Sequence, residues 1–335
     1  MAPTTVEARR TVALTGASGH LGRALIEDLL RRGFNVRILV HKTPVHGTLP
    51  SEVQIFYGSI LSPESLSPFL RDCDYLIHSA ALISLDGDKG GRVQAVNVEG
   101  TRHVLDCALR NGVRKVIHVS SIHAFNSRPC RKPLNEERDL CPPRSSAYDI
   151  SKRRSQELAL SYVEKGLNVS VVCPTSLIGP PDYGPSPQGK ALLDIVKGKV
   201  PAVFPGGYDF LDVRDAAHAI VNALTQAMAG QAYILSGEYV TIRQLVEWVH
   251  EFSGRRKLIP TIPFIAGYTL LPFLGLWSKL NRSQIRFTRE ILKTLQHSPR
   301  LVDSSKARKE LGLQPRPIRE SVHDTLKWFL ENNLM

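Results

Sequence analysis

The chain has 335 residues, with 43 Lys or Arg against 31 Asp or Glu, and so carries a formal net charge of +12. This length suffices for one large α/β domain or two smaller ones, which excludes a small disulfide scaffold. Apolar residues make up 42% and charged residues 22% of the chain, a composition that excludes disordered and fibrous proteins.

The cysteines and the first residues bear on the compartment. Five cysteines are scattered along the chain without a C-x-x-C pair, which favours a reducing compartment and argues against a structural zinc site. No apolar run precedes Arg9 and Arg10, so the first residues do not resemble a secretory signal. We expect a cytoplasmic protein without a bound metal.

From Thr11 onward, short β-rich segments alternate with segments of helical period. A helix is expected over residues 20–32, where Gly33 terminates its apolar face. Strands separated by helices predict an α/β fold with a parallel, doubly wound sheet. The expected strands are TVALTG, NVRILV, VQIFYG, DYLIHSA, KVIHVSS and NVSVVC.

A glycine-rich loop, TGASGHLG, joins the first expected strand to the first helix. Gly16 permits a tight turn, Gly19 lets backbone N–H groups approach a pyrophosphate, and Gly22 allows close helix packing. This pattern predicts a dinucleotide site, although a flexible turn between strand and helix is the simpler alternative. The expected contacts are Gly16, Ser18, Gly19, His20, Leu21 and Gly22.

The end of the second strand bears on the choice of cofactor. An acidic side chain there would bind the ribose 2′-hydroxyl of NAD and repel a 2′-phosphate. This chain has His41 and Lys42 instead, which favours NADP and leaves NAD open. The alternative is that both residues are simply solvated.

Tyr148 and Lys152 lie four residues apart, just after a serine and Asp149 that indicate a helix start. A phenol is a poor acid or base at neutral pH unless a cation lies close, so we expect Lys152 and the positive nicotinamide of an oxidised cofactor to lower the pKa of Tyr148. Ser121 ends the strand before them and could hold a substrate carbonyl. The simpler alternatives are that Tyr148 and Lys152 are solvated neighbours on a surface helix and that Ser121 only caps a strand.

The regular pattern ends after Pro174, where a loop rich in proline and glycine begins. Residues 209–240 contain a helical pattern and a further strand, and we expect them to return to the sheet. The prediction is thus a doubly wound domain over residues 1–175, with a smaller, discontinuous substrate-binding region over residues 176–208 and 241–335.

Together these motifs resemble the extended short-chain dehydrogenase/reductase family of the NAD-dependent epimerase/dehydratase superfamily. The likeness covers residues 11–236 and is greatest to the branch of dihydroflavonol 4-reductase-like and 3β-hydroxysteroid dehydrogenase-like proteins. It rests on TGASGHLG, DYLIHSAA, NVEGT, VSS, YDISK, and PTSLIGP followed by FLDVRDAA. The resemblance implies a Rossmann fold with NADP bound to the first domain.

The resemblance also implies roles for individual residues. Tyr148 would exchange a proton with the substrate oxygen, Lys152 would bind the nicotinamide ribose and tune Tyr148, and Ser121 would orient the carbonyl. Further cofactor contacts would come from Ala80, Ala81, Asn97 and Pro174.

Three functions follow from this reading. The first is an NADP(H)-dependent oxidoreductase that interconverts a ketone or aldehyde and an alcohol on a bulky apolar substrate. The second is a sugar-nucleotide epimerase or dehydratase, although Cys173 stands where such members commonly carry arginine. The third is a non-catalytic dinucleotide-sensing protein, which would not need the complete set of Ser121, Tyr148 and Lys152.

Much of the positive charge lies near the end of the chain, where residues 279–319 hold eleven Lys or Arg against three acidic residues. Before it, residues 258–277 are uncharged but contain three prolines, which makes a spanning helix doubtful and favours a pocket lid or interfacial segment. If helical, the charged segment carries a basic stripe. The stripe residues are Arg282, Arg286, Arg289 and Lys293.

Three readings of this region stay open: peripheral membrane contact through residues 255–293, recognition of a phosphorylated or CoA-linked substrate, and a solvated helix beside a lid. A homodimer is also open. Few aromatic residues and no recognition motif argue against nucleic-acid binding.

Overall fold

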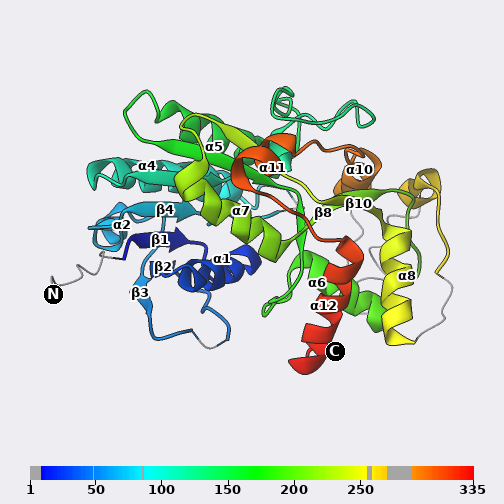
Figure 1. Ribbon diagram of the computed structural model, residues 1–335. Coiled ribbons are helices and arrows are strands. Elements are labelled where there is room, and N and C mark those ends of the chain that lie inside the picture. Colours follow the sequence, from blue (N-terminus) through cyan, green and yellow to red (C-terminus); the bar gives the residue numbers. More distant parts are fainter. Residues whose placement is uncertain (1–8, 48, 85–86, 255–258, 270–288) are drawn as a thin grey trace.

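The computed structural model describes residues 9–47, 49–84, 87–254, 259–269 and 289–335. Within them, a seven-stranded parallel sheet with the order β3-β2-β1-β4-β5-β6-β9 forms the centre of the molecule (Figure 1). This arrangement confirms the predicted doubly wound fold of Rossmann type. The strands are β1 (Thr11–Thr15), β2 (Asn35–Val40), β3 (Val53–Tyr57), β4 (Tyr75–His78), β5 (Lys115–Val119), β6 (Val169–Pro174) and β9 (Ala232–Leu235).

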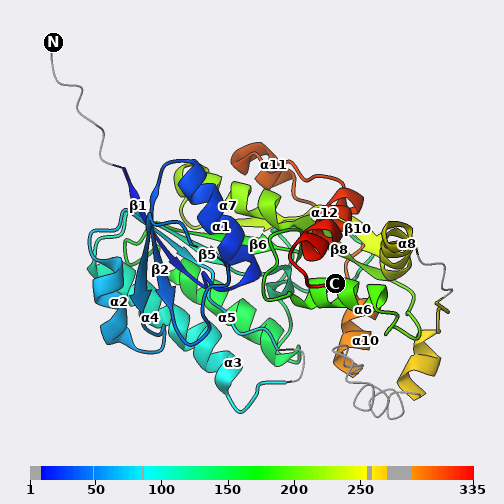
Figure 2. The ribbon, with the colours of Figure 1, turned by 90° about the horizontal axis from the view of Figure 1, so that it is seen from below.

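Helices cover both faces of this sheet. Figure 2 shows α1 (His20–Arg31), α7 (Val213–Gln226) and α11 (Ser305–Leu311) on one face. The other face carries α2, α4 and α5 in the same view. Each helix layer buries its apolar side chains against the central strands, which are themselves apolar on both faces, as parallel strands between two helix layers must be. The elements of the second layer are α2 (Pro63–Leu70), α3 (Arg92–Gln94), the π-helical turn η1 (Ala95–Glu99), α4 (Gly100–Arg110) and α5 (Ala147–Ser161).

The first strand, loop and helix illustrate how the sequence specifies this packing. Leu25 and Leu29 of α1 are completely buried, which matches the predicted apolar face. The helix ends at Arg31, and Gly33 follows with a φ of +78°, a left-handed conformation that glycine adopts without strain. The chain then re-enters the sheet at β2.

A second, smaller sheet with the order β10-β8-β7 forms the other part of the molecule. Its middle strand pairs in antiparallel fashion with β10 and in parallel fashion with β7, and α6, α8 and α12 pack around it. Its strands are β7 (Ser176–Ile178), β8 (Gly207–Asp212) and β10 (Glu238–Thr241). Its helices are α6 (Pro187–Val196), α8 (Ile242–Ser253) and α12 (Ile318–Glu331), and α10 (Arg289–Gln296) lies nearby.

Residues 209–240 are therefore divided between the two sheets. Strand β9 lies at the edge of the large sheet, whereas β8 and β10 belong to the small one. The helix and further strand expected in this segment, α7 and β9, do pack with the large sheet, whereas the two ends of the segment form strands of the small sheet. The strand that pairs with β8 in parallel, β7, is separated from it by α6, and such distant pairing leaves no local signal in the sequence.

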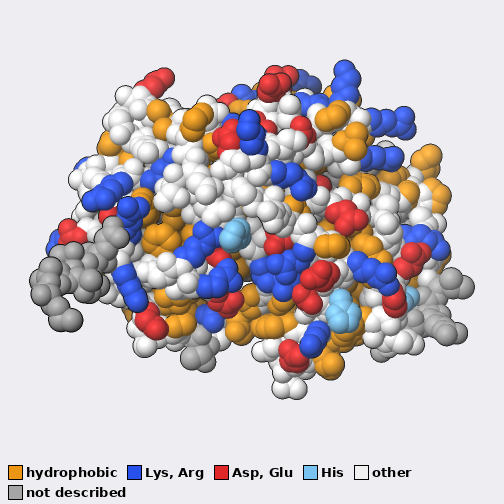
Figure 3. Space-filling model, viewed as in Figure 1, with side chains coloured by type: hydrophobic (Ala, Val, Ile, Leu, Met, Phe, Trp, Pro, Cys, Tyr) orange, Lys and Arg blue, Asp and Glu red, His pale blue; other side chains and the backbone are white. Residues whose placement is uncertain are grey.

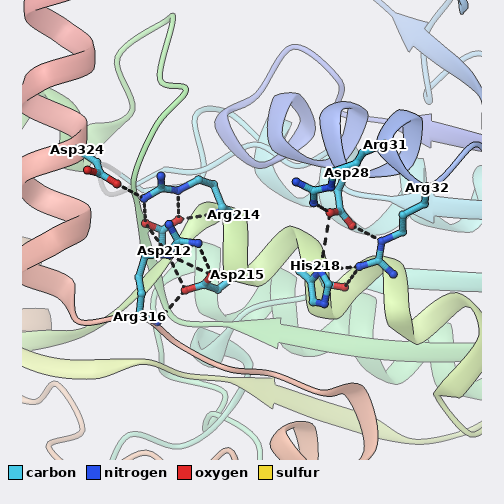
Figure 4. Close-up of polar contacts among 9 residues, drawn as sticks. All are labelled: Asp28, Arg31, Arg32, Asp212, Arg214, Asp215, His218, Arg316 and Asp324. Atoms are coloured by element: carbon cyan, nitrogen blue, oxygen red, sulfur yellow. Dashed lines mark hydrogen bonds and ion pairs between the residues drawn. The ribbon is translucent and has the colours of Figure 1, made fainter.

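Ion pairs hold the two parts together (Figure 4). Asp212 is completely buried at the start of α7, where its carboxylate accepts hydrogen bonds from Arg214. Burial acts to raise the pKa of Asp212, but the bonds and charge of Arg214 hold that pKa below its ordinary value. Arg214 also pairs with Asp324 of α12 at 2.7 Å, and Arg316 pairs with Asp215 at 2.8 Å.

A second cluster in Figure 4 joins α1 to α7. Asp28 pairs with Arg31 and Arg32 of its own helix, and Arg32 reaches His218 Nδ1 of α7 at 2.7 Å. These contacts join the C-terminal end of α1 to α7, the helix that follows β8 of the small sheet.

The segment considered for membrane contact is described only in part, since Arg282, Arg286 and the rest of 270–288 lie outside the described residues. Ile259 and Gly267 are buried, Ile265 is 81% exposed, and Lys293 lies exposed on α10. None of the helices in the described ranges has the length and apolar character needed to cross a membrane. On the face in Figure 3, basic and acidic side chains are interspersed.

Candidate active site

The glycine-rich loop is closely packed at two of its glycines. A Cβ on Gly16 would lie 2.6 Å from the nitrogen of Ala80, and one on Gly22 would lie 2.2 Å from the carbonyl oxygen of Gly16. Gly19 is different, because a Cβ there would meet only the oxygen of Gly16 at 3.4 Å. Gly19 is the N-cap of α1, and no side chain caps the helix. The first backbone N–H groups of α1 therefore suit a pyrophosphate.

The other predicted loop contacts have distinct surroundings. Ser18 is exposed, whereas Leu21 is 7% exposed and belongs to the core. His20 Nε2 lies 2.7 Å from the carbonyl oxygen of Gly179, in the segment after β7. The side chain of His20 thus ties the loop to the second part of the molecule.

His41 and Lys42 follow β2 directly, and both side chains are exposed. Neither forms an ion pair or side-chain hydrogen bond with any residue that the structure describes. They lie at the carboxyl edge of the sheet, the edge at which doubly wound folds bind their ligands. A ligand phosphate could therefore approach both side chains.

Asn97 is enclosed by protein groups, with an exposed fraction of 1%. Its Oδ1 accepts a hydrogen bond from the Leu82 nitrogen at 2.7 Å, and its Nδ2 donates to the Leu82 oxygen at 3.1 Å and to Ser151 Oγ at 2.8 Å. It lies in the π-helical turn η1, a local geometry often found at functional sites. Asn97 therefore links the backbone of Leu82 to Ser151 of α5 through hydrogen bonds.

The remaining predicted cofactor contacts lie at the ends of strands. Ala80 follows β4, and its nitrogen donates to Thr15 Oγ1 at 3.3 Å, while Ala81 beside it is exposed. Pro174 is the last residue of β6 and is buried next to Leu235 of β9. All three residues therefore lie at the carboxyl edge of the large sheet.

The structure brings the three predicted catalytic residues together. Ser146 caps α5 by accepting a hydrogen bond from the Asp149 nitrogen at 3.1 Å, which places Tyr148 and Lys152 one turn apart at the start of the helix. Ser121 follows β5, and its side chain interacts with Tyr148. Their exposed fractions are 7% for Tyr148, 4% for Lys152 and 8% for Ser121.

Burial controls the acidity of this group. It raises the pKa of Tyr148 to about 12, with the Ser121 hydrogen bond acting to lower that pKa and the Asp149 charge to raise it. Burial also lowers the pKa of Lys152 to about 8, and its ammonium donates to the Val119 carbonyl at 3.0 Å. The expectation of a lowered tyrosine pKa is therefore wrong for the protein groups themselves, because burial outweighs the polar contacts.

Two functional candidates were missed in the sequence, His123 and the side chain of Asp149. His123 Nδ1 lies 2.9 Å from Asp149 Oδ1, and the His123 ring meets the Tyr148 ring edge-on, with 5.5 Å between centroids. A polar ring two residues after Ser121, at the carboxyl edge of the sheet, was the signal that could have identified His123.

A cavity of about 270 Å³ opens beside these residues. It is lined by residues from the loop after β5, the start of α5, strand β8 and α10. Figure 1 labels α5, β8 and α10 in the upper half of the molecule. Its lining includes His123, whose ring contacts that of Tyr148, and Asp149, but not Ser121, Tyr148 or Lys152 themselves. Its apolar lining includes Ile122, Phe125, Tyr208 and Val302.

The described part of the chain contains neither a disulfide nor a candidate metal site. All five cysteines are free thiols, and no group of three or more His, Cys, Asp or Glu is arranged there to hold a metal ion.

The chain was compared with known proteins. Residues 12–236 match the model of the NAD dependent epimerase/dehydratase family. Sterol demethylase protein B of Methylococcus capsulatus is 33% identical over 97% of this chain and 100% of that protein. A putative dihydroflavonol 4-reductase of Synechocystis is 27% identical over 94% and 93% of the two chains.

A solved structure, that of gox2253, is 30% identical and superposes with a TM-score of 0.83 over 98% of this chain and 100% of that one. The family match covers the glycine-rich loop, Ser121, Tyr148 and Lys152. The protein therefore belongs to the NAD dependent epimerase/dehydratase family and is an NAD(P)-dependent enzyme of the extended short-chain dehydrogenase/reductase type.

Proposed function

We propose that the protein is an NADP(H)-dependent oxidoreductase that interconverts a ketone or aldehyde and an alcohol, with Tyr148 as general acid and base. The observation that carries this proposal is the buried set of Ser121, Tyr148 and Lys152 beside a cavity. Such a set has a use in proton transfer to a substrate oxygen, whereas a protein that only senses a dinucleotide does not need it.

The protein groups suit the reductive direction. When bound, a nicotinamide cofactor supplies the hydride. Ser121 and Tyr148 donate hydrogen bonds to the carbonyl oxygen and stabilise the negative charge that develops on it. The pKa of about 12 keeps Tyr148 protonated at neutral pH, so that it can give up its proton. The ammonium of Lys152, one helical turn from Tyr148, would then favour the phenolate that remains.

Cofactor binding falls to the large sheet and its loops. Gly16, Gly19 and Gly22 would hold the pyrophosphate at the start of α1. The exposed side chains of His41 and Lys42 would interact with a 2′-phosphate, which supports NADP rather than NAD. The small sheet with its helices, together with α10, would form the substrate-binding region.

The apolar lining of the cavity supports a substrate with a bulky apolar part. Ile122, Phe125 and Val302 contribute to this lining, and burial of apolar substrate surface against such side chains favours binding. The names of the two relatives, a sterol demethylase protein and a putative dihydroflavonol reductase, are consistent with ring-containing substrates.

The test is to follow the absorbance of the reduced nicotinamide across a panel of bulky ketones and aldehydes, with NADPH and NADH in parallel. We expect NADPH to be oxidised faster than NADH at equal concentration. Failure to oxidise either cofactor with any carbonyl, combined with conversion of a sugar nucleotide without net cofactor oxidation, would replace this proposal by an epimerase or dehydratase.

A further inference from the structure

The cavity near Tyr148 has several basic side chains in its lining, which we call its basic wall. Arg128 and Arg144 come from the segment between β5 and α5, and Lys293 and His297 come from α10 and the residue after it. All four line the cavity, although about 150 residues of sequence separate the two segments. The fold thus gathers basic side chains at a site where a substrate would bind.

The acidic residues of the same cavity already have partners. Asp149 lies 2.9 Å from His123, as described above. Asp209 is 9% exposed and accepts hydrogen bonds from Ser236 Oγ at 3.0 Å and from the Gly237 nitrogen at 3.1 Å. The basic wall is not neutralised by these carboxylates, because no ion pair within 4 Å joins its three Lys and Arg residues to any acid in the described ranges.

Arg128 is held in place by its neighbours. His297 Nδ1 lies 2.8 Å from the carbonyl oxygen of Lys293, to which it must donate. The other ring nitrogen, Nε2, therefore accepts a hydrogen bond from Arg128 Nη2 at 2.7 Å. The carbonyl of Arg128 accepts a bond from Arg138 Nη1 at 2.9 Å. The Nε and Nη1 atoms of Arg128 make no hydrogen bond with the described residues and can donate to a ligand.

We propose that this wall, centred on Arg128 and Lys293, binds an anionic group of the substrate, a carboxylate or a phosphate. The substrate would then be amphipathic, with its apolar part against Ile122, Phe125 and Val302 and its anionic group at the basic wall. A guanidinium fork and an ammonium suit the oxygens of either anion. The proposal rests on the proposed function, since it concerns the substrate of the same cavity.

The test uses binding, so that its result does not depend on turnover. Isothermal titration calorimetry would compare 2-naphthoate, 2-naphthyl phosphate and methyl 2-naphthoate on the protein saturated with its oxidised cofactor. Saturation keeps the phosphate probe out of the cofactor site. The three probes share one apolar ring system, so differences among them report the anionic group. The carboxylate and phosphate arms show which anion the wall prefers.

We expect at least one anionic probe to bind about tenfold tighter than the neutral ester at low salt, with the difference shrinking at high salt. Arg128→Gln should remove this difference and Lys293→Gln should reduce it, whereas both should leave binding of the ester unchanged. The matched control Arg131→Gln changes an exposed arginine outside the cavity and should have no effect.

Equal binding of ester and anions, failure of all three probes to bind, or an equal loss in Arg131→Gln would overturn the proposal. The proposed function is tested separately, because NADPH oxidation with a neutral ketone can succeed when the anionic preference is absent. Conversely, anion binding that depends on Arg128 can persist in a protein that reduces no carbonyl.

Discussion

The side-chain amide of Asn97 donates a hydrogen bond to Ser151 Oγ at 2.8 Å, and Ser151 Oγ in turn donates to the backbone carbonyl of Tyr148 at 2.7 Å. The π-helical turn is thereby joined to the helix that carries the proposed acid and base. Ser151 lies one turn from Tyr148 on the same helix. The position of Tyr148 therefore depends on Asn97, which is 51 positions earlier in the chain.

This connection continues to the cofactor loop. Thr101 Oγ1 donates to the Asn97 carbonyl at 2.8 Å and lies 2.9 Å from His78 Nε2, while His78 Nδ1 lies 2.7 Å from Thr15 Oγ1. Burial lowers the pKa of His78 to about 3, so the ring is neutral and can both donate and accept. A buried polar chain therefore extends from the residue before Gly16 to Tyr148.

The first prediction concerns Asn97→Ala. The change removes the side-chain partner of both Leu82 backbone groups and the donor to Ser151 Oγ, so we expect unfolding to become easier by about 2 kcal/mol and turnover to fall with it. Urea denaturation measures the first effect. Asn35→Ala removes a hydrogen bond from an exposed asparagine and serves as the control. Equal stability of the two variants would show that the Asn97 contacts do not matter.

The second prediction separates two glycines of the same loop. Gly22→Ala should lower the unfolding free energy because the new Cβ would clash with the Gly16 carbonyl. Gly19→Ala has space for its Cβ, so its stability should stay close to that of the wild type, while cofactor binding weakens by about tenfold or more. Thermal unfolding and cofactor titration check both. Unchanged cofactor affinity in Gly19→Ala would contradict the assigned pyrophosphate site.

The third prediction concerns pH and the buried charge of Lys152. Its pKa of about 8 lies below the ordinary value of 10.5, so between these values the unfolded chain binds more protons than the folded one. Stability should therefore rise with pH in this window. The cost of the charge at neutral pH is on the order of 3 kcal/mol, which the hydrogen bond to Val119 offsets only in part.

Lys152→Met should accordingly be more stable than the wild type below about pH 8, with the advantage lost as pH approaches the ordinary lysine pKa. Denaturant titrations across this range measure it. The exposed Lys190→Met should show no such dependence. A stability difference that stays constant with pH would mean that burial does not depress the pKa of Lys152.

The fourth prediction concerns the choice of cofactor. In Lys42→Glu a carboxylate replaces an exposed ammonium near the expected 2′-phosphate, so NADPH should bind about tenfold more weakly while NADH binding changes little. Fluorescence titration of both reduced cofactors measures the ratio, with Lys190→Glu as the control for a general change of charge. A parallel loss for NADPH and NADH would remove Lys42 from the 2′-phosphate site.

The sequence predicts the large sheet closely because its signals are local. Strands β1 to β6 are short apolar runs bounded by glycine or polar residues, and Ser146 with Asp149 identifies the start of α5. Side chains that follow parallel strands meet at one edge of the sheet, so Ser121 and the loop at Gly16 could be placed there without coordinates.

The rest depends on contacts between distant segments. Pairing of β7 with β8, and the meeting of Arg128 with His297 across 169 positions, follow from tertiary packing, which leaves no periodic pattern in the sequence. The pKa of Tyr148 has the same origin, because it depends on how completely neighbouring elements bury the phenol. The sequence motifs identified Tyr148 as a candidate, but not that its pKa is raised.

Comparison of the wild type with Tyr148→Phe tests the central claim most directly. With NADPH and a bulky ketone that the wild type reduces, the account predicts that turnover falls by about a thousandfold or more while the dissociation constant of NADPH changes less than about threefold. Loss of the phenolic proton donor affects the chemical step and leaves the cofactor loop intact. Turnover in Tyr148→Phe equal to that of the wild type would contradict the assignment of Tyr148 as the acid and base.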